Sequence, residues 1–452
     1  MERIAIKELY KWQKNPKKRP LILRGTRQVG KTWLMKEFAR QAYKSSIYIN
    51  CDNNRVIEQL FAEDLVIERI IKGIELYAGE KFDINETLLI FDEIQEIPRA
   101  LTTLKYFSES EKPYNIICAG SLLGVALHQG TSFPVGKVEF LDLYPLSFIE
   151  FLNALGYRRY CDLMTNQDFA LLKTFSTKLI DLLKQYYYIG GMPEVVASFC
   201  DDGDYEKARI IQKRILDAFE FDFSKHAPSE IVPKIRMLWK SIPQQLAKEN
   251  KKFIYSMVKE GGRAREFEYA LMWLNDCGLV RQLHRVTAPR LPLRAYEDVK
   301  AFKLFLLDIG LLTCMCDLKA ETIIMGNSLF TEFKGALTEQ YVLQELTAAQ
   351  DFTTYYWANE RNNAEIDFLL DNGRQVIPME VKAGINLKSK SLKVYREKFI
   401  PQIALRCSLA AFKDQGNLID VPLYLVNQLA ALTGGLKIPV EKENIEYHGN
   451  DE

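Results

Sequence analysis

Histidine is scarce in this sequence, and its cysteines follow no pattern. Only four histidines occur in 452 residues, and the eight cysteines have no repeated spacing. The close pair Cys314 and Cys316 has no second pair to complete a tetrahedral site. The sequence therefore disfavours a structural zinc site and predicts free thiols buried in the protein interior.

The sequence also lacks a long apolar run. No segment reaches the roughly 18–20 consecutive apolar residues that span a bilayer. The most apolar segment, residues 304–316, is interrupted by Asp308. The first eight residues carry charges where a signal peptide has an apolar run. We therefore expect a cytoplasmic protein without a membrane partner.

An excess of charge of one sign is absent as well. Lysine and arginine number 60 against 59 aspartates and glutamates, which gives a formal net charge of +1. The chain as a whole is thus not a basic nucleic-acid binder, and any such surface must be local. With 48% hydrophobic and 26% charged residues, the composition is that of a globular protein and excludes a wholly disordered chain. At about 100–200 residues per domain, the length predicts two to four domains.

The first 150 residues alternate between short apolar segments and helical patterns. Strands are predicted at residues 20–24, 46–50, 87–91, 114–119 and 137–143, with helices at about 31–43 and 55–78. This alternation predicts an α/β fold with a parallel sheet and crossover helices. Residues 148–223 are predicted to be mostly helical, and residues 329–430 to contain a helix, two or three strands, a second helix and a strand.

A glycine-rich segment lies between the first predicted strand and the helix after it. It reads Gly25-Thr26-Arg27-Gln28-Val29-Gly30-Lys31-Thr32 and fits the pattern G-x-x-x-x-G-K-[ST]. The glycines allow successive N–H groups to face phosphate oxygens, and the helix N-terminus adds partial positive charge. Lys31 is expected to reach the β- and γ-phosphates of ATP, and the Thr32 hydroxyl to ligate Mg²⁺.

Two carboxylates, Asp92 and Glu93, end the apolar strand at residues 88–91. Because ligands bind at the carboxyl ends of parallel strands, we expect Asp92 to hold Mg²⁺ and Glu93 to act as general base on the attacking water. An Asp-Glu pair favours an ATPase over a kinase or a GTPase. After the next strand, Ser121 is placed either as a polar sensor of the γ-phosphate or as a plain strand-to-loop cap.

The middle of the chain has a pattern that is typical of a winged helix. Residues 263–275 form an amphipathic helical pattern, and a hairpin is predicted after Gly278. Basic residues outnumber acidic ones in the hairpin region: Arg281, Arg285, Arg290, Arg294, Lys300 and Lys303 against Glu297 and Asp298. DNA phosphates attract such a local excess, although winged helices also serve as packing modules.

Near the C-terminus, two predicted strands are joined by a turn at residues 371–373. Strand parity places Asp367 on the same face as Glu380 and Lys382, nearly opposite them. Two carboxylates and a lysine on one face can hold Mg²⁺ and activate water, and the D…E-x-K spacing is a signature of metal-dependent nucleases. The alternative is a hairpin with a charged face toward solvent.

Several motifs together resemble a family of prokaryotic AAA+-type ATPases. They are the glycine-rich segment preceded by Arg24, the strand ending in Asp92-Glu93, the pair Gly120-Ser121, and residues 144–148 (YPLSF) and 190–194 (GGMPE). Members of this family join the ATPase core to a winged-helix region and a C-terminal domain of restriction-endonuclease-like fold. The resemblance implies the same fold here, and Glu339 matches the acidic residue that often precedes the nuclease motif.

The resemblance also bears on the arginine finger that some ATPases supply in trans. The family often has Gly-Arg before its fifth core strand, whereas this sequence has Gly136-Lys137. Arg158 and Arg159 are other candidates, with solvated helix arginines as the plain alternative. No feature of the sequence fixes an oligomeric state.

These patterns predict five parts of the chain. An ATPase core at residues 1–150 is followed by a helical lid at 151–225, a winged-helix-like region at 226–320, a nuclease-like α/β domain at 325–432 and a polar tail at 433–452. One functional hypothesis is Mg²⁺-dependent ATP hydrolysis coupled to a DNA-associated, nuclease-like module. The other is an ATP-controlled switch that binds a protein or DNA partner without cutting it.

Overall fold

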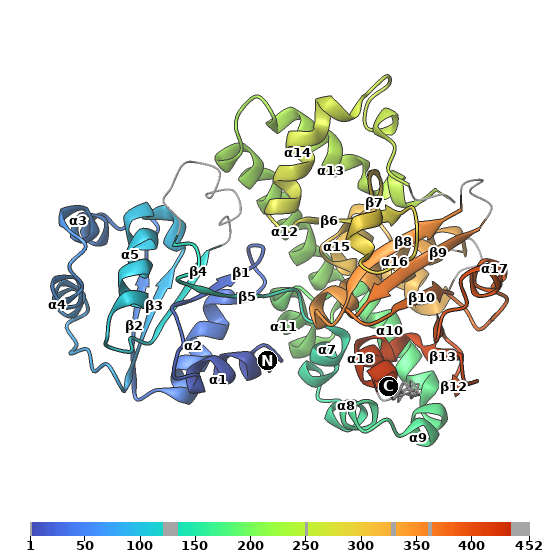
Figure 1. Ribbon diagram of the computed structural model, residues 1–452, viewed down its shortest axis with the longest axis horizontal. Coiled ribbons are helices and arrows are strands. Elements are labelled where there is room, and N and C mark those ends of the chain that lie inside the picture. The colour runs from blue at the N-terminus through green and yellow to red at the C-terminus, as the bar shows by residue number, and fades with distance from the viewer. Residues whose placement is uncertain (1, 121–133, 249–251, 327–330, 360–363, 435–452) are drawn as a thin grey trace, which may run out of the picture.

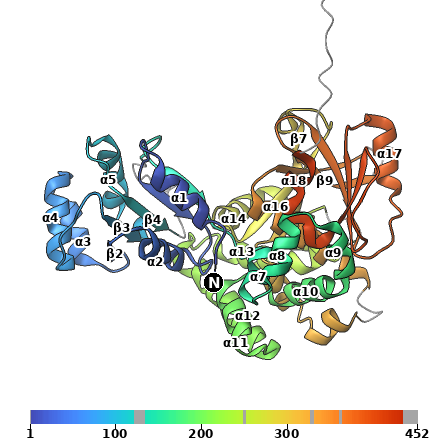
Figure 2. The ribbon, with the colours of Figure 1, turned by 90° about the horizontal axis from the view of Figure 1, so that it is seen from below.

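The computed structural model describes residues 2–120, 134–248, 252–326, 331–359 and 364–434 (Figure 1). Two bodies are visible from both directions of view (Figures 1 and 2). The smaller body contains the elements from the N-terminus to β5, and the larger body contains the remaining elements. None of the helices in these residues combines the length and the apolarity that crossing a bilayer requires.

The smaller body is built on a parallel sheet. Its strands follow the order β2-β3-β4-β1-β5, and every neighbouring pair is parallel. The predicted α/β fold with a parallel sheet is therefore confirmed. The strand bounds are β1 (Leu21–Arg24), β2 (Ser45–Asn50), β3 (Thr87–Asp92), β4 (Ile116–Gly120) and β5 (Glu139–Asp142).

Helices cover both faces of this sheet because its central strands are apolar on both sides. In β3, Leu88 and Ile90 pack with Leu34 and Phe38 of one helical layer, whereas Leu89 and Phe91 belong to the core on the opposite face. The helical stretch predicted at 55–78 consists of two helices, which residues 64–66 separate, and the sequence did not predict the helix before β4. The helix bounds are α1 (Ile6–Lys14), α2 (Lys31–Ala42), α3 (Arg55–Glu63), α4 (Ile67–Ala78) and α5 (Pro98–Glu109).

The larger body begins with helices, as predicted. A break after α10 is fixed by Asp308, whose carboxylate accepts a hydrogen bond from Gly191 N at 2.6 Å. A Cβ at Gly190 would lie 2.2 Å from the same carboxylate, so only glycine fits there. The helices are α7 (Phe148–Ala154), α8 (Arg158–Thr165), α9 (Phe169–Thr174), α10 (Ser176–Ile189), α11 (Pro193–Asp202), α12 (Tyr205–His226), α13 (Val232–Leu246) and α14 (Ala264–Asp276).

A second, mixed sheet joins the basic hairpin to the C-terminal strands. Its order is β12-β13-β11-β10-β9-β8-β6-β7, and β6 pairs in parallel with β8. The hairpin β6–β7 thus forms one edge of this sheet. The strands are β6 (Val280–Val286), β7 (Glu297–Leu306), β8 (Thr353–Ala358), β9 (Glu365–Asp371), β10 (Val376–Val381), β11 (Ala404–Ser408), β12 (Lys413–Asp414) and β13 (Leu418–Pro422).

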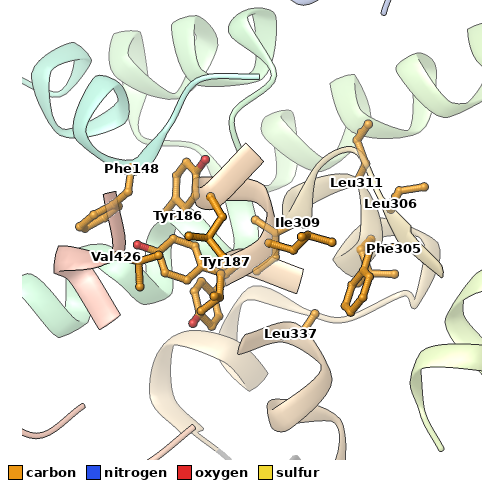
Figure 3. Packing of buried hydrophobic residues seen from close by; sticks show 14 of the residues in the cluster. Phe148, Tyr186, Tyr187, Phe305, Leu306, Ile309, Leu311, Leu337 and Val426 are labelled. Carbon is orange, nitrogen blue, oxygen red and sulfur yellow. The ribbon is translucent and has the colours of Figure 1, made fainter. Parts of the chain in front are cut away.

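One hydrophobic core extends through the larger body. Phe148 of α7, Tyr186 of α10, Phe305 of β7 and Leu337 of α16 belong to the same cluster, together with Val426 near the C-terminus (Figure 3). The regions predicted as lid, winged helix and nuclease-like domain therefore share a core. The other α-helices described here are α15 (Ile309–Met315), α16 (Thr331–Ala349), α17 (Lys390–Phe399) and α18 (Leu429–Gly434), and one of several short helices of other types, η7 (Leu423–Gln428), precedes α18.

The eight cysteines are free thiols, as predicted. Six of them are buried, but the prediction of burial is wrong for Cys200, which is exposed, and Cys316 is half-buried. Burial raises the pKa of Cys51 to about 12, which keeps that thiol protonated and unreactive. In the part of the chain that the structure describes, no group of three or more His, Cys, Asp or Glu side chains could hold a metal ion.

Candidate functional site

The glycine-rich segment forms a tight loop between β1 and the start of α2. Gly25, Gln28 and Gly30 have positive φ angles of +146°, +67° and +92°, which curl the backbone. A Cβ at Gly25 would lie 2.3 Å from the carbonyl oxygen of Leu143, so this position accepts only glycine. The loop leads directly into α2, whose free N–H groups make its first turn suited to an anion.

Lys31, the first residue of α2, is buried against this loop. Its Nζ donates hydrogen bonds to the carbonyl oxygens of Gly25 at 2.7 Å and Thr26 at 2.9 Å. Burial lowers the pKa of Lys31 to about 8, although the nearby carboxylates of Glu93 and Asp92 act to raise it. The ammonium group is therefore held beside the loop and beside two carboxylates.

Asp92 lies next to the loop, as the positions of the strand ends predict. Its Oδ2 accepts a hydrogen bond from the Thr32 hydroxyl at 2.5 Å and another from the Tyr48 hydroxyl at 2.9 Å. Because β1 and β3 are parallel members of one sheet, their carboxyl ends share an edge. A hydroxyl and a carboxylate in contact are hard oxygen donors, which fit Mg²⁺, an ion that takes few ligands from the protein when phosphates supply the others.

Glu93 follows Asp92 in a left-handed conformation with φ of +50°. Its backbone N–H donates to Asp92 Oδ1 at 3.1 Å, and its Oε2 accepts a hydrogen bond from Gln95 Nε2 at 2.6 Å. The strained turn and the Gln95 contact hold this half-buried carboxylate beside Asp92. Ser121 lies outside the described residues, which on β4 end at Gly120.

Residues from the larger body contact the glycine-rich loop, and no pattern in the sequence predicts these contacts. The Thr26 hydroxyl donates to the carbonyl oxygen of Cys277 at 2.9 Å. Arg27 forms an ion pair with Asp222, and its guanidinium lies 3.2 Å from Nε2 of His226. Burial and the Arg27 charge lower the pKa of His226 below its usual value. The end of α12 and the turn after α14 therefore cover one side of the loop.

Arg3 covers another side of the loop. Its guanidinium donates to the carbonyl oxygen of Val29 at 2.8 Å, to that of Tyr144 at 2.7 Å and to Glu150 Oε1 at 3.0 Å. Arg3 and Glu150 are both buried, so this ion pair ties the loop to the first helix of the larger body. A single basic residue in the N-terminal segment has no sequence signature that would predict this position.

A cavity of about 320 Å³ adjoins the loop on the side of the larger body. Gly25, Thr26 and Val29 line it together with the turn after α14. Arg281 also lines this cavity, with its guanidinium 5.6 Å from the centre of the Tyr144 ring. The loop thus faces a space that both bodies enclose.

The acidic residues predicted near the C-terminus also come together. Strands β10 and β9 are antiparallel, and their paired residues run from Val376 opposite Asp371 to Met379 opposite Phe368. The next step of this register places Glu380 opposite Asp367. Glu380 Oε1 lies 2.5 Å from Lys382 Nζ, and Glu339 of α16 lies 3.5 Å from Nζ of Lys303. Lys303 is close to this cluster, whereas the sequence suggested a position in a DNA-contacting wing.

The basic residues of the hairpin do not form one free surface. Arg285 pairs with Asp298 at 2.6 Å and Lys303 is buried, whereas Arg290, Arg294 and Lys300 are exposed.

The three candidate positions for an arginine finger differ in their surroundings. Lys137 pairs with Glu109 and Arg158 with Glu2, and Arg159 is exposed.

Three family models match separate parts of the chain. Residues 17–152 match the family model of an AAA domain. Residues 180–322 match a domain of unknown function (DUF8612), and residues 334–424 match another domain of unknown function (DUF4143). No curated protein matches the sequence. The AAA match covers the parallel sheet and the glycine-rich loop, and it supports a P-loop ATPase.

Solved structures similar to this chain have low sequence identity to it. A Walker-type ATPase of Pyrococcus abyssi, PABY2304, is 14% identical over 69% of this chain and 94% of its own, with a TM-score of 0.45. The Aeropyrum pernix ORC1 protein, in complex with DNA, is 13% identical over 69% and 91%, with a TM-score of 0.29. Caenorhabditis elegans PCH-2 is 16% identical over 35% and 46%, with a TM-score of 0.23. Their TM-scores are 0.45 or less, so these structures carry no argument about this chain. The support for a P-loop ATPase comes from the AAA match and from the glycine-rich loop.

Proposed function

We propose that this chain binds ATP at the loop of residues 25–32 and hydrolyses it. The observation that supports this function best is the 2.5 Å contact between Thr32 and Asp92, beside the buried Lys31. A glycine-rich turn alone occurs in many proteins. A loop lysine, a helix hydroxyl and a strand-end carboxylate within one site are specific to phosphate and magnesium chemistry.

In the proposed reaction, the loop and Lys31 bind the phosphates. The backbone N–H groups of residues 25–32 offer hydrogen bonds to phosphate oxygens, and Lys31 turns from the carbonyl oxygens of Gly25 and Thr26 to reach the β- and γ-phosphates. A phosphate anion beside Lys31 also favours its charged form, which offsets the effect of burial on its pKa.

Thr32 and Asp92 are the proposed ligands of Mg²⁺. The ion, when bound, would neutralise charge on the phosphate oxygens. Glu93 is the proposed general base, which accepts a proton from the attacking water while Gln95 restrains its carboxylate. Ser121 is retained as a proposed polar contact to the γ-phosphate, on the strength of its position after β4.

We further propose that nucleotide binding is transmitted to the larger body. Arg27 and Thr26 are part of the proposed phosphate-binding loop. Arg27 contacts Asp222, and Thr26 contacts Cys277, both in the larger body. A triphosphate at the loop would compete for the Arg27 guanidinium and change these contacts. Because one core cluster joins the helices of the larger body to the C-terminal sheet, such a change would affect that sheet as well.

The proposed partner of the larger body is DNA or another protein, which it binds without cutting. A surface for polyanions is available on α17 and the segment before it, where Lys388, Lys390, Lys393 and Lys398 are exposed. The winged-helix-like hairpin adds Arg290, Arg294 and Lys300. The nuclease alternative, with Glu339, Asp367, Glu380 and Lys382 as its site, is less well supported, because lysines pair with two of its carboxylates: Lys382 with Glu380 and Lys303 with Glu339.

Nucleotide binding and steady-state ATP hydrolysis by the Lys31→Ala variant test the central proposal. Both should fall to background, because the variant removes the cation of the phosphate site. Arg40→Ala is the matched control, since Arg40 is on the same helix but is exposed and pairs with Glu37. Normal hydrolysis by Lys31→Ala would contradict the proposal.

A further inference from the structure

Lys303 has an unusual position for a lysine. It lies on β7, and its side chain is only 1% exposed. Its Nζ is 2.5 Å from Glu365 Oε1 and 3.5 Å from Glu339 Oε2. Burial alone would lower the pKa of Lys303, but Glu339, Glu365 and Asp367 raise it above its usual value. The ammonium group therefore stays charged between the carboxylates of Glu339 and Glu365, with the charge of Asp367 also acting on it.

Asp367 and the neighbouring Glu380 also accept hydrogen bonds from other groups of the protein. Asp367 Oδ2 accepts a hydrogen bond from the backbone N–H of Val381 at 2.7 Å. Glu380 binds Lys382 through Oε1 at 2.5 Å and accepts the backbone N–H of Leu392 through Oε2 at 3.1 Å. A divalent ion at Asp367 and Glu380, which the sequence predicts, does not fit this arrangement.

We propose that Lys303 is a built-in cation that takes the place of a divalent metal ion in this acidic cluster. The carboxylates of Glu339, Glu365 and Asp367 come from α16 and β9, within residues 334–424, whereas Lys303 comes from β7 in the preceding matched region. The neutralising charge is thus supplied by a part of the chain that lies outside the C-terminal domain. This inference does not depend on the proposed ATPase activity.

The same geometry has a consequence for a variant without this lysine. If a neutral side chain replaces Lys303, three buried or half-buried carboxylates remain close together with no cation among them. Carboxylate oxygens are the ligands that Mg²⁺ and Mn²⁺ prefer. As they stand around the ammonium group, these carboxylates form no group that could hold a metal ion. Without Lys303 they should close around a divalent ion, because an uncompensated group of buried carboxylates is unfavourable.

Titration with Mn²⁺, followed by electron paramagnetic resonance and by thermal unfolding, tests this inference. All proteins carry Asp92→Asn, so that the proposed ATP site contributes no metal binding. The Lys303→Met variant should bind Mn²⁺ and gain thermal stability from it, and adding Asp367→Asn should weaken both effects. The parent protein and Lys300→Met, which replaces an exposed lysine on the same strand, should show neither effect.

Each other outcome contradicts the inference. Mn²⁺ binding by the parent protein that is lost in Asp367→Asn would mean that the cluster is a metal site with Lys303 in place. A folded Lys303→Met variant that binds no Mn²⁺ would make Lys303 an ordinary structural ion pair. A Lys303→Met variant that stays unfolded with Mn²⁺ would mean that a metal cannot replace the ammonium group.

Discussion

The Thr26 hydroxyl donates a hydrogen bond to the carbonyl oxygen of Cys277 at 2.9 Å, although 251 residues separate them in the chain. The contact is close, since a Cβ at the next residue, Gly278, would lie 2.8 Å from that hydroxyl. A phosphate-binding loop is thus connected directly to the turn after α14. Any ligand that repositions the loop must also act on the larger body.

The ion pair between Arg27 and Asp222 should oppose nucleotide binding. In the Asp222→Ala variant, Arg27 loses its carboxylate partner on α12, so we expect the Kd for ATP to fall by a few-fold, in line with about 0.2–1 kcal/mol for a partly exposed ion pair. Titration with a fluorescent ATP analogue measures this change. Asp217→Ala, an exposed position on the same helix, should leave the Kd unaltered. A higher Kd in Asp222→Ala would mean that the pair supports binding.

Replacement of the proposed general base should separate binding from turnover. Glu93→Gln keeps the shape of the side chain but cannot accept a proton, so we expect ATP to bind normally and the turnover to fall by roughly 10²–10⁴-fold. Single-turnover hydrolysis and equilibrium binding distinguish the two steps. If Glu93→Gln hydrolyses ATP at the rate of the unaltered protein, another group removes the proton.

Gly25 should tolerate no side chain. The Gly25→Ala variant would place a methyl group 2.3 Å from the Leu143 carbonyl oxygen at a φ of +146°, so the loop must distort and ATP binding should be lost. Gly335→Ala is a suitable control, because a Cβ there meets nothing within 4 Å in the helix α16. It should be neutral or stabilising by up to about 1 kcal/mol. Thermal unfolding and ATP binding of both variants test this pair of outcomes.

The free energy of unfolding should decrease as the pH rises because of Glu345, a buried carboxyl group in α16. Burial raises the pKa of Glu345 from 4.5 to about 8 in the folded protein. Between these values the folded state holds a proton that the unfolded state releases, so a rise in pH through this range lowers the free energy of unfolding. Above about pH 8 this contribution no longer changes.

The Glu345→Gln variant tests this assignment. The amide oxygen can still accept the 2.8 Å hydrogen bond from Phe148 N, while the titrating group is gone. Because one pKa unit corresponds to about 1.4 kcal/mol, the variant should be more stable than the unaltered protein by a few kcal/mol at pH 8 and nearly equal to it at pH 4.5. Urea unfolding at the two pH values measures the difference. An equal difference at both would exclude Glu345 as its source.

Short-range patterns were sufficient to predict the loop and its nearest partners. Residues 25–32 are adjacent in sequence, and a parallel sheet brings Asp92 to the edge that the loop occupies. The opposition of Asp367 and Glu380 likewise follows from strand parity and a short turn. These inferences need only the spacing of apolar residues along the sequence and the direction of the strands.

Contacts between distant segments could not be predicted in this way. The basic side chains of the hairpin have the same sequence signature whether they face solvent or a carboxylate, so the burial of Lys303 against Glu365 was not evident. The pairing of β6 with β8 was hidden for a similar reason, since a hairpin can satisfy its own backbone on one side and still join another strand on the other.

The parallel pairing of β6 with β8 has a practical consequence for dissecting this protein. A fragment that begins after residue 325 would lose β6 and β7, leaving the backbone of β8 as an open edge and Glu365 without its ammonium partner. Open edges of this kind recruit strands from other chains. The C-terminal piece expressed by itself should therefore self-associate, whereas cutting the chain between Asp142 and Phe148 would leave both sheets whole.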